Sequence, residues 1–259
     1  MFASDRRNQI SNWVYEKRHV DVSELSSFFN VSEVTIRKDL ILLEKNGKLI
    51  RTYGGAISME QANSVASQNT GNSNTSISGG AIPKLLACMV DDGDLIYLGS
   101  GILCTNAARI LKEKASLSVI TNNITAASIL IENPNISVVM PPGEVYKKLE
   151  NELLLGTETE SYLSAKSVDK AIISVDSVKM NGYSINDLST CKAYQEILNH
   201  ADSIIIAAES DSFNRNAIAY LGKLNIADKI VGDKSIPEEY ISYFYENRIK
   251  VFNSYNIES

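Results

Sequence analysis

Apolar residues recur at helical spacing near the start of the chain. Residues 5–17 place Ile10, Trp13 and Val14 on one face, which predicts a first helix. A second, short helix is predicted over the segment SELSSFF, which begins at Ser23. Its apolar side chains are expected to point inward: Leu25, Phe28 and Phe29.

A third helix is predicted over residues 32–45. Its apolar positions lie four and then three residues apart, at Ile36, Leu40 and Leu43, and form one stripe that can be buried. Ser32 is expected to cap this helix, because its hydroxyl can accept a hydrogen bond from a backbone N–H of the first turn. Residues 48–58, KLIRTYGGAIS, show the alternation and the glycines of a small hairpin.

From residue 81 onward, short runs rich in β-branched residues alternate with amphipathic segments. Strands are predicted at DLIYLGSG, LSVITNN, ISVVMPPG, DKAIISVDS, SIIIAAESDS, KIVGD and IKVF. Helices are predicted between them, including a polar helical stretch after ISVVMPPG. This alternation predicts an α/β fold with a mostly parallel sheet that helices cover on both faces.

The stretch between these two parts has a different composition. Residues 61–80 carry no charge and consist mostly of Asn, Ser, Thr, Gln and Gly. Such a segment cannot bury enough apolar surface to offset the entropy of ordering it. We therefore expect a domain over 1–60, a polar linker over 61–80 and a second domain over 81–259.

Charge is divided unevenly between the two parts. The formal net charge of the chain is −6, but residues 1–59 carry a net +2 and the other 200 residues a net −8. Whole-chain acidity therefore does not exclude a nucleic-acid partner for the smaller part.

Other classes of protein are excluded more directly. No apolar run approaches the roughly 18 residues that span a bilayer, and the N-terminus MFASDRRNQI lacks the apolar core of a signal peptide. The cysteines Cys88, Cys104 and Cys191 are isolated, which fits a reducing cytoplasm and neither a disulfide framework nor a zinc site. We expect a cytoplasmic protein without membrane association, metal or cofactor.

The predicted third helix carries side chains suited to reading DNA. With its stripe buried, Val34 and Lys38 point away from the core, and Thr35 and Arg37 lie on the flanks. A helix fits the major groove, where cations and hydroxyls contact phosphates and base edges. The candidate DNA-binding residues are Ser32, Glu33, Val34, Thr35, Arg37 and Lys38 on the helix, and Lys48, Arg51 and Tyr53 on the hairpin.

The same region resembles a known family. The segment VDVSELSSFFNVSEVTIRKDLILLEKNGKLIRTYGGA resembles the N-terminal winged helix-turn-helix of DeoR-type bacterial transcription regulators. Lys38 replaces the usual second arginine of that pattern, and Tyr53 stands where histidine is common. The resemblance implies that the partner is a double-stranded DNA operator. It also implies a transcription regulator, more often a repressor than an activator.

In the second part, polar loops follow the predicted strands. They are Gly99-Ser100-Gly101, Thr121-Asn122-Asn123, Pro142-Gly143-Glu144, Asp176-Ser177 and Glu209-Ser210-Asp211-Ser212. Ligands of open parallel sheets bind at the carboxyl ends of the strands. The candidate effector-binding residues are Gly99, Ser100, Gly101, Thr121, Asn122, Gly143, Asp176, Glu209 and Ser212.

The resemblance extends over this part and implies an effector domain related in fold to ribose-5-phosphate isomerase, which senses a phosphorylated sugar. This sequence departs from the pattern. Ile102 and Leu103 replace two hydroxyl residues, Ser212 replaces a lysine, and Tyr194 stands where a second lysine is usual. A pocket with fewer cations is less favourable for a phosphate dianion. The effector could therefore be a sugar phosphate bound by altered contacts, or a neutral or aminated sugar, or the domain could bind no effector and only dimerise. We expect the chain to form a homo-oligomer, a dimer or a tetramer.

Three other functions compete with the regulator. The second domain could be an enzyme of the isomerase or deaminase type, with Asp176, Glu144 or Glu209 as general acid or base. Such loop carboxylates more often cap helices or face water, so we favour a protein that is not an enzyme. The chain could also be a constitutive DNA-binding protein with a degenerate pocket. Cys104 near a helix start could serve as a thiol sensor, although buried cysteines are commoner.

Overall fold

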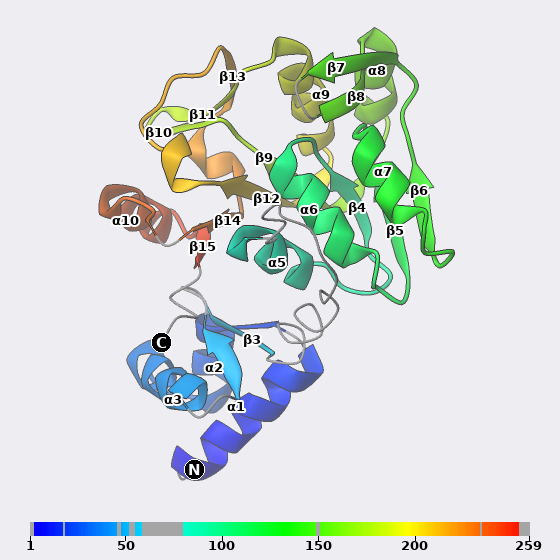
Figure 1. Cartoon of the computed structure of the whole chain (residues 1–259). Coiled ribbons are helices and arrows are strands. Elements are labelled where there is room, and N and C mark those ends of the chain that lie inside the picture. Colours follow the sequence, from blue (N-terminus) through cyan, green and yellow to red (C-terminus); the bar gives the residue numbers. More distant parts are fainter. Residues whose placement is uncertain are drawn as a thin grey trace, which may run out of the picture. The chain divides into compact units, whose positions relative to one another are not determined.

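The computed structural model describes residues 3–17, 19–45, 48–51, 55–58, 80–148, 151–233 and 235–253. The chain divides into two compact units, residues 1–78 with 252–259, and residues 79–251 (Figure 1). The predicted linker over 61–80 lies outside the described residues apart from Gly80.

The first unit combines helices with a small sheet. Its described elements are α1 (Ala3–Lys17), β1 (His19–Asp21), α2 (Val22–Phe29), α3 (Glu33–Lys45), β2 (Leu49–Arg51) and β3 (Gly55–Ser58). The predicted hairpin is confirmed, since β2 pairs antiparallel with β3. The third strand, β1, was not predicted, because three residues are too few to show alternation; it pairs antiparallel with β3. A Cβ on Gly55 would lie 1.9 Å from the Val20 carbonyl oxygen, so this close pairing requires glycine.

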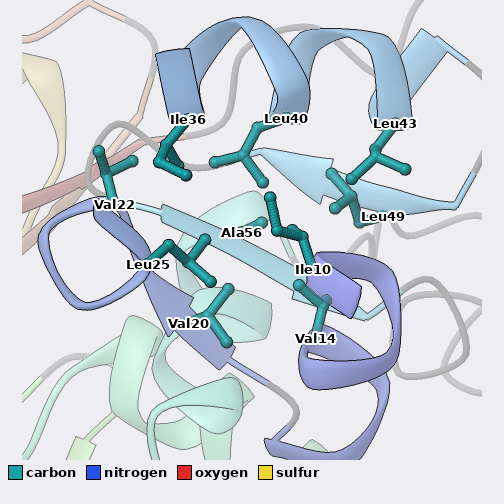
Figure 2. Packing of buried hydrophobic residues seen from close by; sticks show 10 residues of the cluster. All are labelled: Ile10, Val14, Val20, Val22, Leu25, Ile36, Leu40, Leu43, Leu49 and Ala56. Atoms are coloured by element: carbon teal, nitrogen blue, oxygen red, sulfur yellow. The ribbon is translucent and has the colours of Figure 1, made fainter. Parts of the chain in front are cut away.

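Each helix and strand that the structure describes in this unit contributes to one core (Figure 2). The buried side chains are Ile10, Val14, Val20, Val22, Leu25, Ile36, Leu40, Leu43, Leu49 and Ala56. The predicted stripe of α3 is therefore confirmed. The inward orientation of Phe28 was wrong, because its side chain is 60% exposed. The inner face of α2 is formed by Val22 and Leu25, and Phe28 instead packs on Trp13, with 4.2 Å between the ring centroids.

The second unit is built on a seven-stranded sheet with the order β15-β14-β12-β9-β4-β5-β6. Its strands are β4 (Leu95–Leu98), β5 (Leu117–Ile120), β6 (Ile136–Val139), β9 (Val168–Ser174), β12 (Ala201–Ala208), β14 (Lys229–Gly232) and β15 (Lys250–Asn253), whose last two residues lie past the boundary at residue 251. The pairs from β14 through β6 are all parallel. The predicted α/β fold with a mostly parallel sheet is confirmed.

Helices cover both faces of this sheet (Figure 1). They are α5 (Ala81–Cys88), α6 (Ile102–Leu111), α7 (Ile124–Leu130), α8 (Thr157–Ser164), α9 (Leu188–Leu198) and α10 (Glu238–Glu246). The chain proceeds from β4 through α6 and α7 toward one edge of the sheet, and from β9 through α9 and α10 toward the other. Right-handed crossovers in opposite directions place the two sets on opposite faces. Within the sets, α6 packs on both α5 and α7, and α8 packs on α9.

Residues 144–155 correct the sequence prediction. A polar helical stretch was expected after β6, but a helix begins only at α8, and the residues before it form strands β7 (Glu144–Lys148) and β8 (Asn151–Leu155), which pair antiparallel. The segment NELLL gives the reason, because Leu153 and Leu155 are buried and alternate with more exposed positions, which is strand spacing.

A second small sheet was also absent from the prediction. Strands β10 (Ser177–Lys179), β11 (Gly182–Ile185) and β13 (Ala219–Gly222) form it in the order β10-β11-β13. The 3-10 helices η1 (Ser210–Ser212) and η2 (Leu224–Ile226) flank β13 in the chain. Each strand has only three or four residues, too few for a periodic signal.

Candidate nucleic-acid interface and effector site

A tight turn joins α2 to α3 and sets the start of the second of these helices. Asn30 ends α2 in the left-handed conformation, with φ 50°, which Asn tolerates better than most residues. Ser32 follows and stands immediately before α3, where its Oγ accepts a hydrogen bond from the Thr35 backbone N–H at 3.3 Å. The Ser32 and Thr35 hydroxyls also lie 2.9 Å apart. The predicted cap of α3 is therefore present, and both hydroxyls lie at the start of the helix.

The outer face of α3 carries the side chains that the spacing predicts there. Val34 is 62% exposed and Lys38 is exposed, whereas Thr35 is half-buried at the flank. Arg37 is also at the flank, and its Nη2 lies 3.3 Å from Glu33 Oε2 in an i,i+4 ion pair. Exposed pairs of this kind contribute only about 0.3–0.5 kcal/mol. Arg37 can therefore exchange Glu33 for another acceptor at little cost.

A buried ion pair that no sequence pattern predicts holds α3 against α1. Arg6 Nε lies 2.6 Å from Asp39 Oδ2, and Arg7 Nε lies 3.7 Å from Asp39 Oδ1. The Asp39 side chain is only 6% exposed. Asp39 lies on the inner side of α3, one residue before the buried Leu40. A side chain on α1 therefore contributes to the position of the helix whose outer face carries Val34 and Lys38.

The strands after α3 carry the remaining candidate DNA-binding residues. Lys48 is exposed, and its backbone N–H bonds the Leu43 carbonyl at 3.0 Å, which fixes the start of the hairpin against α3. Arg51 ends β2, where it pairs with Ala56 of β3. The Arg51 side chain and the whole of Tyr53 lie outside the described residues.

In the second unit, strand order gathers three of the predicted loops. The strands β4, β9 and β12 are adjacent, and the pairing continues past their ends: the Gly99 N–H bonds the Ile172 carbonyl at 2.8 Å, and the Val175 N–H bonds the Ala207 carbonyl at 3.1 Å. Six candidate effector residues follow these strands: Gly99, Ser100, Gly101, Asp176, Glu209 and Ser212. They lie at one edge of the sheet, the carboxyl ends of its central strands, where ligands of this architecture bind.

The first of these loops is closed by a tyrosine of α9. The Ser100 backbone N–H donates to the Tyr194 hydroxyl oxygen at 2.7 Å, and the Ser100 and Tyr194 hydroxyls also lie 2.7 Å apart. On the other side, the Ser174 hydroxyl donates to the Ser100 carbonyl at 2.9 Å. Gly101 has φ +93°, a conformation that favours glycine, and a Cβ on Gly99 would lie 2.7 Å from the Tyr194 hydroxyl. Both glycines are needed for this arrangement.

The loop after β5 is polar but internal. Thr121, Asn122 and Asn123 all have 0% exposed surface. Asn122 accepts a hydrogen bond from the Tyr97 hydroxyl at 3.0 Å and donates to the Leu154 carbonyl of β8 at 3.2 Å. The β7–β8 hairpin also pairs with this loop through its backbone, since the Leu154 N–H bonds the Asn122 carbonyl at 2.8 Å. Thr121 and Asn122 are therefore placed at the expected edge, with no surface open to a ligand in this conformation.

The three carboxylates that the enzyme alternative would use as general acid or base lie at the surface. Asp176, Glu209 and Glu144 are exposed, and Asp176 Oδ2 accepts the Asn186 backbone N–H at 2.7 Å. Gly143 packs on α8, since a Cβ there would lie 2.3 Å from the Thr159 hydroxyl. Within the described ranges, no three or more His, Cys, Asp or Glu residues are grouped so as to hold a metal ion.

Cys104 does not have the surroundings of a reactive thiol. Its side chain has 0% exposed surface, and burial raises the pKa of the Cys104 thiol from 9.0 to about 12. The thiolate is the reactive form, so a thiol that stays protonated is a poor sensor.

An outward-facing, capped helix beside a β-hairpin, together with a separate parallel α/β unit, defines a winged helix-turn-helix regulator with a second domain. Comparison with known families agrees. Residues 6–62 match the "DeoR-like helix-turn-helix domain", and residues 80–234, more than half of the chain, match the "DeoR C terminal sensor domain". The chain belongs to the DeoR family of transcriptional regulators. It binds DNA through the first domain and a small-molecule effector through the second.

Individual relatives match along nearly the whole chain. The "Putative aga operon transcriptional repressor" of Escherichia coli O157:H7 is 26% identical over 240 residues, which cover 91% of this chain and 88% of that protein. The "Glycerol-3-phosphate regulon repressor" of Escherichia coli (strain K12) is 21% identical over 252 residues, 97% of this chain and 99% of that protein. Among solved structures, D-ribose-5-phosphate isomerase in complex with phospho-erythronic acid matches 51% of each chain at 15% identity, with a TM-score of 0.37. A match at that level does not establish a shared function. Across the described residues, no helix is long and apolar enough to cross a membrane.

Proposed function

We propose that this regulator represses genes of carbohydrate metabolism by binding an operator through α3, and that a small sugar or sugar derivative releases it. The observation that carries the proposal is the capped α3 helix, whose buried stripe leaves Val34 and Lys38 facing outward. The named functions of its relatives, an aga operon repressor and a glycerol-3-phosphate regulon repressor, support repression and a carbohydrate context.

The residues of α3 divide between sequence reading and phosphate contact. Val34 would pack on a thymine methyl, and Arg37 would leave Glu33 to bond a guanine edge or a phosphate. Ser32 and Thr35 present hydroxyls at the helix start, where backbone phosphates commonly bind. Lys38 on α3, with Lys48 and Arg51 on the hairpin, would neutralise phosphates beside the groove.

The effector would bind where the loops after β4, β9 and β12 meet. There Ser100, Asp176, Glu209 and Ser212 supply hydroxyl and carboxylate groups, which suit the hydroxyls of a sugar. Catalysis at this edge of the sheet is the weaker alternative. We expect that the chain does not turn over ribose 5-phosphate or related sugars.

The chain would act as a homo-oligomer in the cytoplasm, since two winged helices can then meet half-sites one helical turn apart. The effector would act through unequal affinity for the DNA-bound and free states.

The DNA-reading assignment is tested with the full chain. Binding sites are selected from random duplex DNA, and the affinity of the best site is measured by fluorescence anisotropy at a fixed salt concentration. Arg37→Ala should weaken binding by about tenfold or more, since a base contact is worth about 1–3 kcal/mol. The control is Lys192→Ala, which removes an exposed cation from α9 and should leave the affinity unchanged. Equal affinity of Arg37→Ala and the unsubstituted chain would overturn the assignment.

A further inference from the structure

We propose that Tyr194 is a specificity-determining residue of the effector site. The Tyr194 hydroxyl occupies the position that a ligand anion would take on the Ser100 loop. The effector is therefore an uncharged sugar or polyol. This inference rests on the proposed function, in which the loop after β4 borders the effector. It deepens that function by separating neutral sugars from phosphorylated ones.

The hydrogen bonds of Ser100 carry the inference. The Ser100 N–H precedes α6, at the place where a backbone N–H and a helix start together attract anions. Its hydrogen bond goes to the Tyr194 hydroxyl oxygen at 2.7 Å, and the Ser100 hydroxyl is engaged by the same oxygen at 2.7 Å. A phosphate oxygen could reach this N–H only by displacing the tyrosine.

Displacing Tyr194 would be costly because the side chain is built into the core. It is 1% exposed, and its ring meets the edge of the fully buried Tyr97 ring in a T-shaped contact, with 6.1 Å between centroids. Gly99 accommodates the tyrosine, since a Cβ at that position would lie 2.7 Å from the Tyr194 hydroxyl. Tyr194 is therefore a fixed part of the loop and does not behave as a surface side chain that swings aside.

The charges around the loop also disfavour a dianion. Charge-assisted bonds are the strong ones in phosphate recognition, and neither the phenol of Tyr194 nor the hydroxyl of Ser212 carries a positive charge. Burial, the neighbouring Cys104 and the carboxylate of Asp176 raise the pKa of the Tyr194 phenol above its usual value, so it stays neutral. Asp176 follows β9, the strand beside β4, so its carboxylate lies at the same edge of the sheet as the Ser100 loop, where it would repel phosphate.

The groups that remain suit a neutral ligand with several hydroxyls. The Ser100 and Tyr194 hydroxyls contain two O–H groups, and the bond between them uses one, which leaves one proton for a third oxygen. Asp176 accepts one backbone N–H through Oδ2, and a carboxylate has acceptor capacity beyond one bond. A sugar hydroxyl both donates and accepts hydrogen bonds. It can therefore accept from the remaining O–H of the Ser100–Tyr194 pair and donate to the Asp176 carboxylate.

The test measures ligand-induced thermal stabilisation of the full chain. The probes are three matched pairs, D-ribose with ribose 5-phosphate, D-glucose with glucose 6-phosphate and glycerol with glycerol 3-phosphate, together with inorganic phosphate. Binding to the native state raises the melting midpoint saturably. In the unsubstituted chain, a free sugar should stabilise at concentrations about tenfold lower than its phosphate ester, and inorganic phosphate should have no effect.

Two variants separate the role of the hydroxyl from general destabilisation. Tyr194→Phe keeps the ring but frees the Ser100 N–H, and should gain saturable stabilisation by inorganic phosphate or by a phosphate ester. Tyr183→Phe is the matched control, because it removes another buried hydroxyl, the one that donates to the Leu224 carbonyl, and should not gain it. Tyr194→Lys serves as a second variant if the first does not fold, and should gain the same response.

The outcomes distinguish this inference from the proposed function. A sugar phosphate that binds the unsubstituted chain more tightly than its free sugar overturns the inference and leaves the sugar-responsive regulator standing. No gain of anion binding in either Tyr194 variant also overturns it. If neither the unsubstituted chain nor any variant responds to any probe, both the inference and the proposed effector edge fail. The DNA-binding part of the proposed function is tested separately, by the operator affinity of Arg37→Ala.

Discussion

Asp39 on the inner side of α3 lies 2.6 Å from Arg6 on α1, measured from Oδ2 to Nε, and both side chains are almost fully buried. This pair joins the first helix of the DNA-binding unit to the helix proposed to read the groove. A buried charge that loses its partner is costly, because the remaining ion stays out of water without compensation.

Replacing Asp39 by alanine should therefore destabilise the first unit by about 3 kcal/mol, and Asp39→Asn should cost less because the amide oxygen can still accept from Arg6. The measurement is urea unfolding followed by tryptophan fluorescence. Trp13 is the only tryptophan of the chain and lies in α1, so its signal reports on this unit.

Glu16→Gln is the control, since it removes an exposed carboxylate from the same helix and should change the free energy of unfolding little. If Asp39→Ala unfolds at the same urea concentration as the Glu16 variant, the ion pair does not stabilise the unit.

Lys38 and Val34 should affect DNA binding in different ways. Lys38→Ala should weaken binding to all sequences to a similar extent and reduce the slope of log affinity against log salt by roughly one, because one phosphate contact is lost. Val34→Ala should leave that slope unchanged and relax the preference for one base pair, because an apolar contact with a thymine methyl reads sequence. Anisotropy titrations over a salt series, on the selected site and on its single-base variants, separate the two. A changed salt slope for Val34→Ala would contradict its assignment to a base.

Local features of the fold could be predicted from the sequence, because each depends on a periodic pattern within one element. Ile36, Leu40 and Leu43 lie on one face of α3 at helical spacing, and that spacing also gives the exposure of Val34 and Lys38. The β-branched runs of the second domain are long enough to identify the parallel strands. The strands of β10, β11 and β13 are too short for this, and their pairing is set by partners distant in the chain.

The polar contacts could not be predicted, because they join residues far apart in the sequence. Asp39 and Arg6 are 33 positions apart, and Ser100 and Tyr194 are 94 positions apart. A charged residue in an amphipathic helix looks like a surface residue until its partner is known. Thr121 shows the same limit, since its place after a strand predicted the edge of the sheet but could not predict the hairpin that pairs with its loop.

Gly99 and Tyr194 should be energetically coupled. Gly99→Ala places a Cβ 2.7 Å from the Tyr194 hydroxyl and 3.0 Å from the ring carbon that bears it, so it should destabilise the second domain by about 1–3 kcal/mol. In a Tyr194→Phe background part of this cost should disappear, because the nearest clashing atom is gone. A double-mutant cycle from chemical unfolding, followed by far-ultraviolet circular dichroism, gives the coupling free energy. Gly80→Ala, where a Cβ meets nothing within 4 Å, is the neutral control. A coupling of zero would mean that the two residues do not share this contact.

Cys104 should be inert in the folded protein and should make stability sensitive to alkaline pH. Burial raises the pKa of its thiol from 9.0 to about 12, so the folded state holds a proton that the unfolded state releases near pH 9. The contribution of this group to stability is fully present below pH 9 and is lost as the pH rises toward about 12, because the unfolded chain then binds fewer protons than the folded one. The free energy of unfolding should accordingly fall between these pH values, and Cys104→Ala should make the fall shallower.

The reactivity of the Cys104 thiol can also be measured directly, by alkylation with iodoacetamide at pH 8 and identification of the modified cysteines by mass spectrometry. Cys88, which is only partly buried, should react first, and Cys104 should react only when the chain is unfolded in urea. Cys88→Ala is the control for the stability measurement and should leave the alkaline slope due to Cys104 in place. Labelling of Cys104 in the folded chain as fast as Cys88 would contradict its buried, protonated state and would restore the thiol sensor as a candidate.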